Sequence, residues 1–272
     1  MKVYISADIE GICGIVNRSH INPQGHDYQR ARMLMTKEVN AAIEGATQTG
    51  AVEIVVNDSH GPMTNILIEE LHPQAQLITG TPKKLGMMEG IDHTFDAVIF
   101  VGYHGKMNSA GVLSHSYDGG VISGICINDR EVGEFGLNGM VAGHFGVPVV
   151  AVTGDHILAE EVQGFNLGIK TVVVKTALGR YTAKCMNPTK ACKLIQNTVK
   201  IGLEERPLIT PLIMEKPISL EMTFLNSGLA ETAAIMPGTQ MIAPNKVRYI
   251  GQDMLEIYRA RMAMTLMAES VL

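Results

Sequence analysis

Apolar runs and helix-like stretches alternate along most of the chain, and this alternation limits the fold more than any other feature. Runs with the composition of β-strands lie at residues 2–7, 52–56, 97–101, 147–152 and 171–174. The run at 97–101 is apolar throughout, which is typical of a strand inside a parallel sheet. Helices expected at 27–48, 66–71 and 132–145 supply the crossovers that parallel neighbours need. The alternation predicts an α/β fold with a doubly wound, mostly parallel sheet.

The pattern of expected helices and strands changes after residue 187. The expected elements are a helix at 188–202, a proline-punctuated linker, a strand at 218–224, short strands near Met241 and Val247, and an end helix from Asp253. This mixture is typical of a small α+β unit. At 272 residues the chain is long enough for two units. We therefore expect an α/β domain at 1–187 and a smaller C-terminal α+β domain at 188–272.

The charge and hydropathy of the chain exclude two classes of partner. The formal net charge is −5, and no run of Lys and Arg is long enough to contact a phosphate backbone, so we expect no nucleic acid partner. Asp8 interrupts the first apolar run before a signal-peptide core is complete, and no later segment approaches the ~18 apolar residues of a membrane helix. We therefore expect no membrane segment and a cytoplasmic location.

Acidic and imidazole side chains directly follow several of the predicted strands. These segments are Asp8-Ile9-Glu10, Asn57-Asp58-Ser59-His60, Gly102-Tyr103-His104 and Gly154-Asp155-His156. Because ligands bind outside the carboxyl ends of parallel strands, the segments are expected to meet at one edge of the sheet. An isolated Asp-x-Glu is commonly a solvated loop, and an isolated His is commonly a hydrogen-bonded core residue. The coincidence of several such segments favours a functional site.

The residue types at this edge are those of a site for divalent metal ions. Asp8 and Glu10 are close in sequence, and neighbouring carboxylates repel each other unless a cation neutralises them. His60 and His104 complete a mixed nitrogen and oxygen set that suits zinc, manganese or cobalt. The cysteines form no C-x-x-C pair, so a thiolate site is not indicated. The other acids at this edge are expected to orient a ligand imidazole through its second nitrogen.

Taken together, these segments resemble the D-aminopeptidase family that is linked to bacterial dipeptide-transport operons. The resemblance rests on Ser6-Ala7-Asp8-Ile9-Glu10-Gly11, Val56-Asn57-Asp58-Ser59-His60, Gly102-Tyr103-His104, Ser114-His115-Ser116 and Ile127-Asn128-Asp129-Arg130-Glu131-Val132-Gly133-Glu134. Met236-Pro237-Gly238-Thr239 and the start of the end helix extend it, so that it covers nearly the whole chain. The order and spacing of these segments are more specific than any one of them.

The resemblance implies a zinc-dependent aminopeptidase that hydrolyses the N-terminal residue, a D-amino acid, from short peptides with a metal-activated water and a catalytic histidine. It implies two divalent metal ions per chain, expected to be Zn²⁺, and a ring-like homo-oligomer. The family's metal ligands fall on Asp8, Glu10, His60, His104 and Glu134, with Asp8 as the bridge, and its catalytic histidine falls on His115. Glu134 lies on an expected helix, and without the resemblance it would be assigned to the surface.

Two other functions use the same residue types. A binding module could hold a dipeptide or a metal at this edge without hydrolysis, although an exported solute-binding protein would carry a signal sequence. A two-metal phosphatase uses similar carboxylate and imidazole ligands. It would need cationic phosphate clamps, and only Lys106 and Arg130 lie close to the candidate ligands in sequence. Both alternatives stay open at the level of the sequence.

Overall fold

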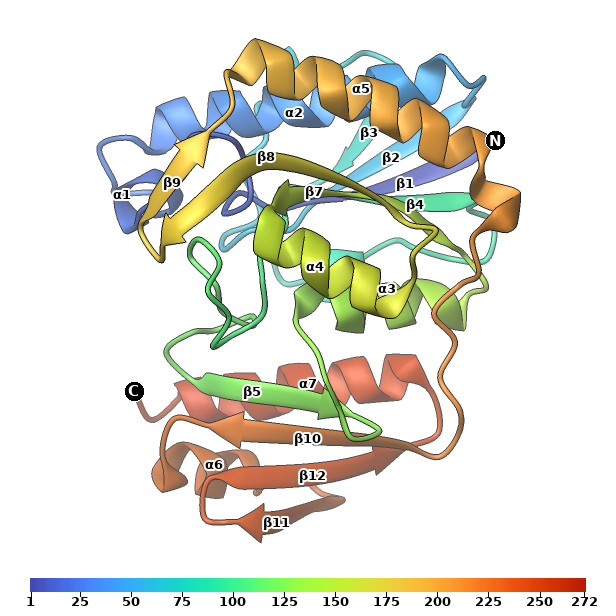
Figure 1. Ribbon diagram of the computed structural model, residues 1–272. Coiled ribbons are helices and arrows are strands. Elements are labelled where there is room, and N and C mark those ends of the chain that lie inside the picture. Colours follow the sequence, from blue (N-terminus) through green and yellow to red (C-terminus); the bar gives the residue numbers. More distant parts are fainter.

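A seven-stranded sheet forms the upper part of the computed structural model, which describes residues 1–272 (Figure 1). The strand order is β3-β2-β1-β4-β7-β8-β9, and all neighbours are parallel except β8 and β9. The strands are β1 (Lys2–Ala7), β2 (Glu53–Asp58), β3 (Ala75–Ile78), β4 (Ala97–Val101), β7 (Val149–Asp155), β8 (Lys170–Gly179) and β9 (Thr182–Cys185). The predicted α/β fold with a doubly wound, mostly parallel sheet is confirmed.

Helices cover both faces of this sheet (Figure 1). One face carries α2 (Tyr28–Thr47) and α5 (Pro188–Glu204), and the other carries α3 (Glu134–His144) and α4 (His156–Phe165). α2 and α5 pack closely because Gly45 has no side chain; a Cβ there would lie 2.5 Å from the carbonyl oxygen of Gln196. α5 begins where the Asn187 side chain accepts a hydrogen bond from the Thr189 N–H, a typical helix cap.

A second, antiparallel sheet lies below the first (Figure 1). Its order is β11-β12-β10-β5-β6, with strands β5 (Ile122–Ile127), β6 (Arg130–Glu131), β10 (Ile218–Phe224), β11 (Thr239–Ala243) and β12 (Lys246–Gly251). Alternate residues of β10 are buried, as expected for a strand with one covered face. The covering helices are α6 (Ser227–Ala233) and α7 (Met254–Glu269). α7 also packs against α3, so it lies between the two sheets.

The sheets do not follow the predicted division of the chain into 1–187 and 188–272. β5 and β6 come from the first segment but belong to the second sheet, where β5 pairs with β10. α5 comes from the second segment but packs on α2 at the first sheet. The chain therefore crosses between the two sheets three times, from β4 to β5, from β6 to β7 and from α5 to β10. The division into two domains remains a prediction, and the order of the strands does not support it.

Several short elements have no counterpart among the predicted ones. The structure adds α1 (Arg18–Ile21), β3, β5, β6, α4, β9 and α6, and the 3₁₀ turns η2 (Gly86–Met88) and η3 (Arg206–Leu208). The helix predicted at 66–71 is a single 3₁₀ turn, η1 (Ile68–Glu70). β5 contains Ser123 and Gly124, which weaken its strand pattern. None of the helices combines the length and the apolar composition needed to span a membrane.

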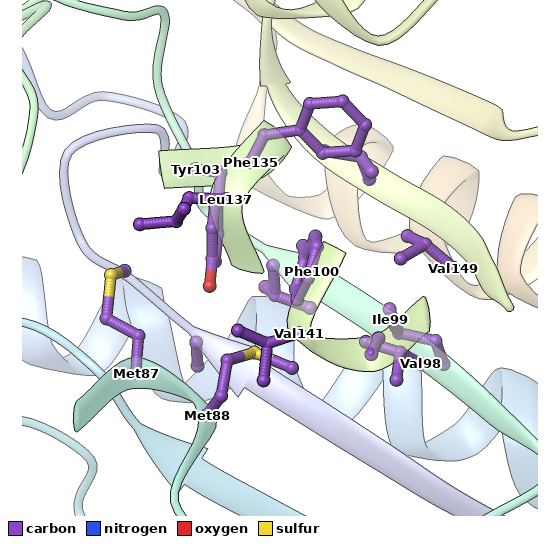
Figure 2. Packing of buried hydrophobic residues seen from close by; sticks show 14 of the residues in the cluster. Met87, Met88, Val98, Ile99, Phe100, Tyr103, Phe135, Leu137, Val141 and Val149 are labelled. Atoms are coloured by element: carbon purple, nitrogen blue, oxygen red, sulfur yellow. The ribbon is translucent and has the colours of Figure 1, made fainter. Parts of the chain in front are cut away.

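An aromatic and aliphatic core fills the space between β4 and α3 (Figure 2). The rings of Phe100 and Tyr103 stack at 4.6 Å, and the Phe135 ring meets Phe100 edge-on at 6.1 Å. The Tyr103 hydroxyl lies 2.7 Å from Ser6 Oγ and accepts a hydrogen bond of 2.9 Å from Asn138 Nδ2. A packed, hydrogen-bonded layer therefore supports the carboxyl ends of the central strands.

Candidate metal centre

The register of the sheet brings the ends of three strands level. Ala7 pairs with Asp58 on β2 and with Val101 on β4, so the residues that follow each strand emerge side by side. Asp8 and Glu10 follow β1, His60 follows β2, and His104 follows β4. These are the four candidate metal ligands among the segments that the strand ends predicted to meet.

Gly11 is required for the turn that directs Glu10 back toward the site. Its N–H donates to the carbonyl oxygen of Gly102 at 2.7 Å. A Cβ at Gly11 would lie 1.9 Å from the carbonyl oxygen of Tyr103, closer than any real side chain allows. The loop after β1 therefore passes the loop after β4 at backbone contact, and only glycine fits there.

Glu134 and His115 reach the same place from a different part of the chain. Glu134 is the first residue of α3, which the chain enters from the β5–β6 hairpin of the second sheet. Its Oε1 accepts a hydrogen bond of 2.6 Å from the Tyr117 N–H. His115 lies in the loop before β5, and its ring stacks on the His104 ring at 4.2 Å with an interplanar angle of 8°. All six predicted site residues thus form one cluster.

The facing atoms of this cluster are close together. His60 Nδ1 lies 2.9 Å from Glu10 Oε2 and 3.4 Å from Asp8 Oδ1. His104 Nε2 lies 3.5 Å from Asp8 Oδ2 and 3.4 Å from Glu134 Oε2. Asp8 therefore presents one carboxylate oxygen to each imidazole, which is the arrangement of a bridging ligand.

Two buried polar atoms in the cluster, Asp8 Oδ2 and His104 Nε2, have no hydrogen-bond partner, and Glu10 Oε2 has only His60 Nδ1 within reach. Buried polar atoms without partners are costly, and native proteins rarely leave them so. The ligand atoms of Asp8, Glu10 and His104 lie within 4.8 Å of one another, as do those of His104, His115 and Glu134. Because both sets consist of carboxylate oxygen and imidazole nitrogen, the residues fit divalent zinc. His115 belongs by position to the second set, which the sequence did not indicate.

Burial and mutual charge perturb every acid and imidazole of the cluster. Burial and the neighbouring Glu10 raise the pKa of Asp8 well above its usual range. Burial would also raise the pKa of Glu10, but the charge of His60 holds it well below its usual range. Burial would lower the pKa of His104, but Glu134 and Asp8 raise it to about 10. Carboxylates that are buried this close together need positive charge nearby. Bound divalent ions would provide that charge in place of protons.

The three imidazoles are oriented by backbone carbonyl oxygens. His60 Nε2 binds Ile21 O at 2.9 Å, and His104 Nδ1 binds Gly105 O at 3.0 Å. His115 Nδ1 binds Leu113 O at 2.9 Å. In each ring the nitrogen that donates to a carbonyl leaves the other nitrogen free to face the site.

The expectation that Asp58 and Asp155 orient these imidazoles is wrong. Asp58 Oδ2 accepts hydrogen bonds from the N–H groups of Asn65 and Ile66, at 2.6 and 2.7 Å. Asp155 caps α4 and also accepts from the Val112 N–H at 2.7 Å. Both acids stabilise loops at the edge of the sheet, because unpaired amide groups lie nearer to them than any imidazole does.

A pocket of about 330 Å³ opens directly above the cluster. Five of the predicted site residues line it, and His104 lies beneath them with 2 % of its surface exposed. The wall that the sequence did not predict consists mainly of Met63, Met87, Tyr117, Asp118, Arg261, Met262, Thr265, Leu266 and Glu269. More than half of these residues belong to α7, whose place between the sheets brings it over the site. The sequence of α7 contained one indication of this wall, because a charged residue, Arg261, falls on the otherwise mostly apolar buried face of the helix.

Comparison with known proteins agrees with this geometry. A model of the D-aminopeptidase family matches residues 1–263. A D-aminopeptidase of Bacillus subtilis is 40% identical over 269 residues, which cover 98% of each chain. The structure also matches a solved zinc-dependent D-aminopeptidase of Bacillus subtilis, described as a self-compartmentalizing protease. The TM-score is 0.97 at 39% identity, with 99% of this chain and 98% of that chain covered. The chain therefore belongs to the D-aminopeptidase family.

Proposed function

We propose that this chain is a zinc-dependent aminopeptidase that removes an N-terminal D-amino acid from short peptides. The observation that carries the proposal is the buried cluster of unpartnered carboxylate and imidazole atoms below a pocket, in a chain of the D-aminopeptidase family. Family membership makes a binding module or a two-metal phosphatase the weaker interpretation of the same residues. The preference for a D-residue rests on the relatives alone.

Two zinc ions per chain account for the arrangement of the ligands. Asp8 would hold both ions, because its two oxygens face different imidazoles. Glu10 and His60 would complete one side of the site, and His104 and Glu134 the other. When bound, zinc supplies a polarised scissile carbonyl and a water of lowered pKa. The protein's own contribution is a rigid, buried frame that fixes the ligands and excludes bulk water.

His115 is placed to carry a proton. Burial and the adjacent His104 lower its pKa, so that Nε2 is free to accept a proton near neutral pH. The hydrogen bond from Nδ1 to Leu113 O fixes the ring, and the ring lines the pocket. From this position His115 would take a proton from the attacking water and give it to the leaving amine. Its Nε2 also lies 3.8 Å from Glu134 Oε1, a position from which it could bind zinc instead. Measuring the zinc content of a His115 variant distinguishes a proton carrier from a metal ligand.

The first test combines elemental analysis with turnover of D-alanine and L-alanine p-nitroanilides. We expect close to two zinc ions per chain, cleavage of the D-substrate, and loss of zinc in His104→Ala. His115→Ala should keep its zinc and lose about 10²-fold or more in kcat. The matched control is His93→Ala, since His93 is exposed and remote from the site. Loss of zinc in His115→Ala would make His115 a ligand, and at most one ion in active enzyme would exclude the dinuclear site.

We further propose a ring-like homo-oligomer that admits only short peptides, because the solved relative is a self-compartmentalizing protease. Light scattering coupled to size exclusion should give a mass several times 29.4 kDa. Activity should fall steeply as substrates lengthen beyond a few residues. A stable, fully active monomer that degrades unfolded proteins would contradict this assembly. The cytoplasmic location stays a prediction.

A further inference from the structure

Arg261 is a buried cation that the fold does not pair with any anion. It lies in the middle of α7 with 6 % of its surface exposed. Its guanidinium lies 3.7 Å from the centre of the Tyr117 ring and 4.6 Å from that of Tyr258. Nε has no hydrogen-bond partner, and the side chain forms no ion pair. Stacking on two aromatic rings offsets part of the cost of burying the charge, but it satisfies none of the five N–H donors.

The guanidinium faces the pocket that contains the metal cluster. Arg261 and Thr265 line this pocket together with Asp8 and Glu134. Tyr117 links Arg261 to the metal cluster, because its ring lies under the guanidinium while its N–H donates to Glu134. A buried, unpartnered Arg side chain that opens into a binding pocket implies that a ligand supplies the missing acceptor.

The two acids of the same pocket do not supply that acceptor. Asp118 and Glu269, the last residue of α7, line the pocket, and neither approaches the Arg261 guanidinium to within the 4.0 Å of an ion pair. Burial and the neighbouring Asp118 raise the pKa of Glu269, and the nearby positive charge of Arg261 opposes this shift without forming an ion pair. Arg261 therefore remains available to an anion that enters with the substrate.

We propose that Arg261 binds the C-terminal carboxylate of a dipeptide substrate and so determines a preference for dipeptides with a free carboxylate. The inference rests on the proposed aminopeptidase function. A planar guanidinium binds a carboxylate through two parallel hydrogen bonds, which is a stronger and more directional contact than lysine provides. In a dipeptide only one residue, which spans ~3.8 Å, lies between the scissile bond and the end of the chain. Its C-terminal carboxylate therefore stays within the 330 Å³ pocket that Arg261 lines.

The test compares D-Ala-D-Ala with its C-terminal amide, D-Ala-D-Ala-NH₂, which differs only in the carboxylate. In the wild type we expect kcat/KM to be about 10- to 100-fold higher for the free acid. Arg261→Met should abolish this preference by lowering kcat/KM for the acid alone, mainly through KM. Arg261→Lys should retain part of it. The matched control is Arg259→Met on the exposed side of the same helix, which should leave the preference unchanged.

Calorimetry on zinc-depleted protein gives a readout without turnover, and it should show tighter binding of the acid than of the amide in the wild type only. A wild type that treats the two substrates equally would overturn the proposal even if Arg261→Met fails to fold. An equal fall in kcat for acid and amide would also overturn it, because that result indicates stabilisation of the reacting carbonyl. If neither substrate is cleaved but the acid binds preferentially through Arg261, the proposed function fails and the carboxylate site stands.

Discussion

Glu38 should make the stability of this protein fall as the pH rises from 4.5 to about 7, and the substitution Glu38→Gln should remove this dependence. The residue lies on α2 and is buried, with 2 % of its surface exposed. Its Oε1 accepts a hydrogen bond of 2.9 Å from the Cys13 N–H, and its Oε2 has no partner. Burial raises its pKa from 4.5 to about 7, although the Cys13 N–H and the nearby Lys175 oppose the shift. The folded state therefore holds a proton on Glu38 that the unfolded state releases.

The sign and the size of the effect follow from this shift. Below pH ~4.5 the group is protonated in both states, and its contribution to stability is complete. Between pH 4.5 and about 7 only the folded state keeps the proton, so the free energy of unfolding falls as the pH rises. At 1.36 kcal/mol per pKa unit, the total loss is ~3 kcal/mol. Glu38→Gln keeps an oxygen for the Cys13 N–H and carries no charge, so it should not show this loss.

The measurement is urea unfolding of wild type and Glu38→Gln at pH 5 and pH 8, with protein and zinc concentrations held fixed. Glu38→Gln should gain ~2.5 kcal/mol relative to the wild type between the two pH values, because a small part of the total loss already occurs below pH 5. Glu44→Gln, an exposed position on the same helix, is the matched control and should give no such gain. Equal differences between Glu38→Gln and the wild type at both pH values would refute the assignment of the buried proton.

Two further substitutions test how the loops hold the metal ligands. Gly11→Ala should lose zinc by elemental analysis while keeping its far-UV circular dichroism, because its Cβ would collide with Tyr103 O; Gly164→Ala, where a Cβ meets nothing, should keep its zinc. Lys175→Met should lower the affinity for zinc at least about 10-fold in competition with a chelator, since the ammonium donates to three carbonyl oxygens of the loop after β1, that of Glu10 among them. Unchanged zinc affinity in Lys175→Met would show that the loop holds its shape without these bonds.

The part of the site that could be predicted from sequence is the part that parallel-sheet geometry determines. Asp8, Glu10, His60 and His104 each follow a strand, and strand register alone makes them neighbours. Glu134 could not be found in this way, because the chain enters the second sheet before it returns to the site in α3. Its assignment came only from resemblance to the family.

The rest depended on contacts between distant elements, which local patterns do not contain. β5 was missed because its Ser and Gly residues weaken a strand signal that pairing with β10 overrides. The helix at α5 was predicted well, but nothing in its own sequence indicated that it packs on α2 instead of the second sheet. Arg261 faces the pocket only because α7 lies between the two layers.

The path of the chain between His104 and Glu134 also bears on the kinetics of folding. His104 Nε2 lies 3.4 Å from Glu134 Oε2, yet the segment that joins these two residues runs through β5 and β6 of the other sheet. The complete ligand set can therefore form only after both sheets have paired and α3 has docked. A transition state that lacks some of these long-range pairings has no complete site for zinc. We thus expect zinc to slow unfolding far more than it speeds folding, so that it acts chiefly on the lifetime of the native state.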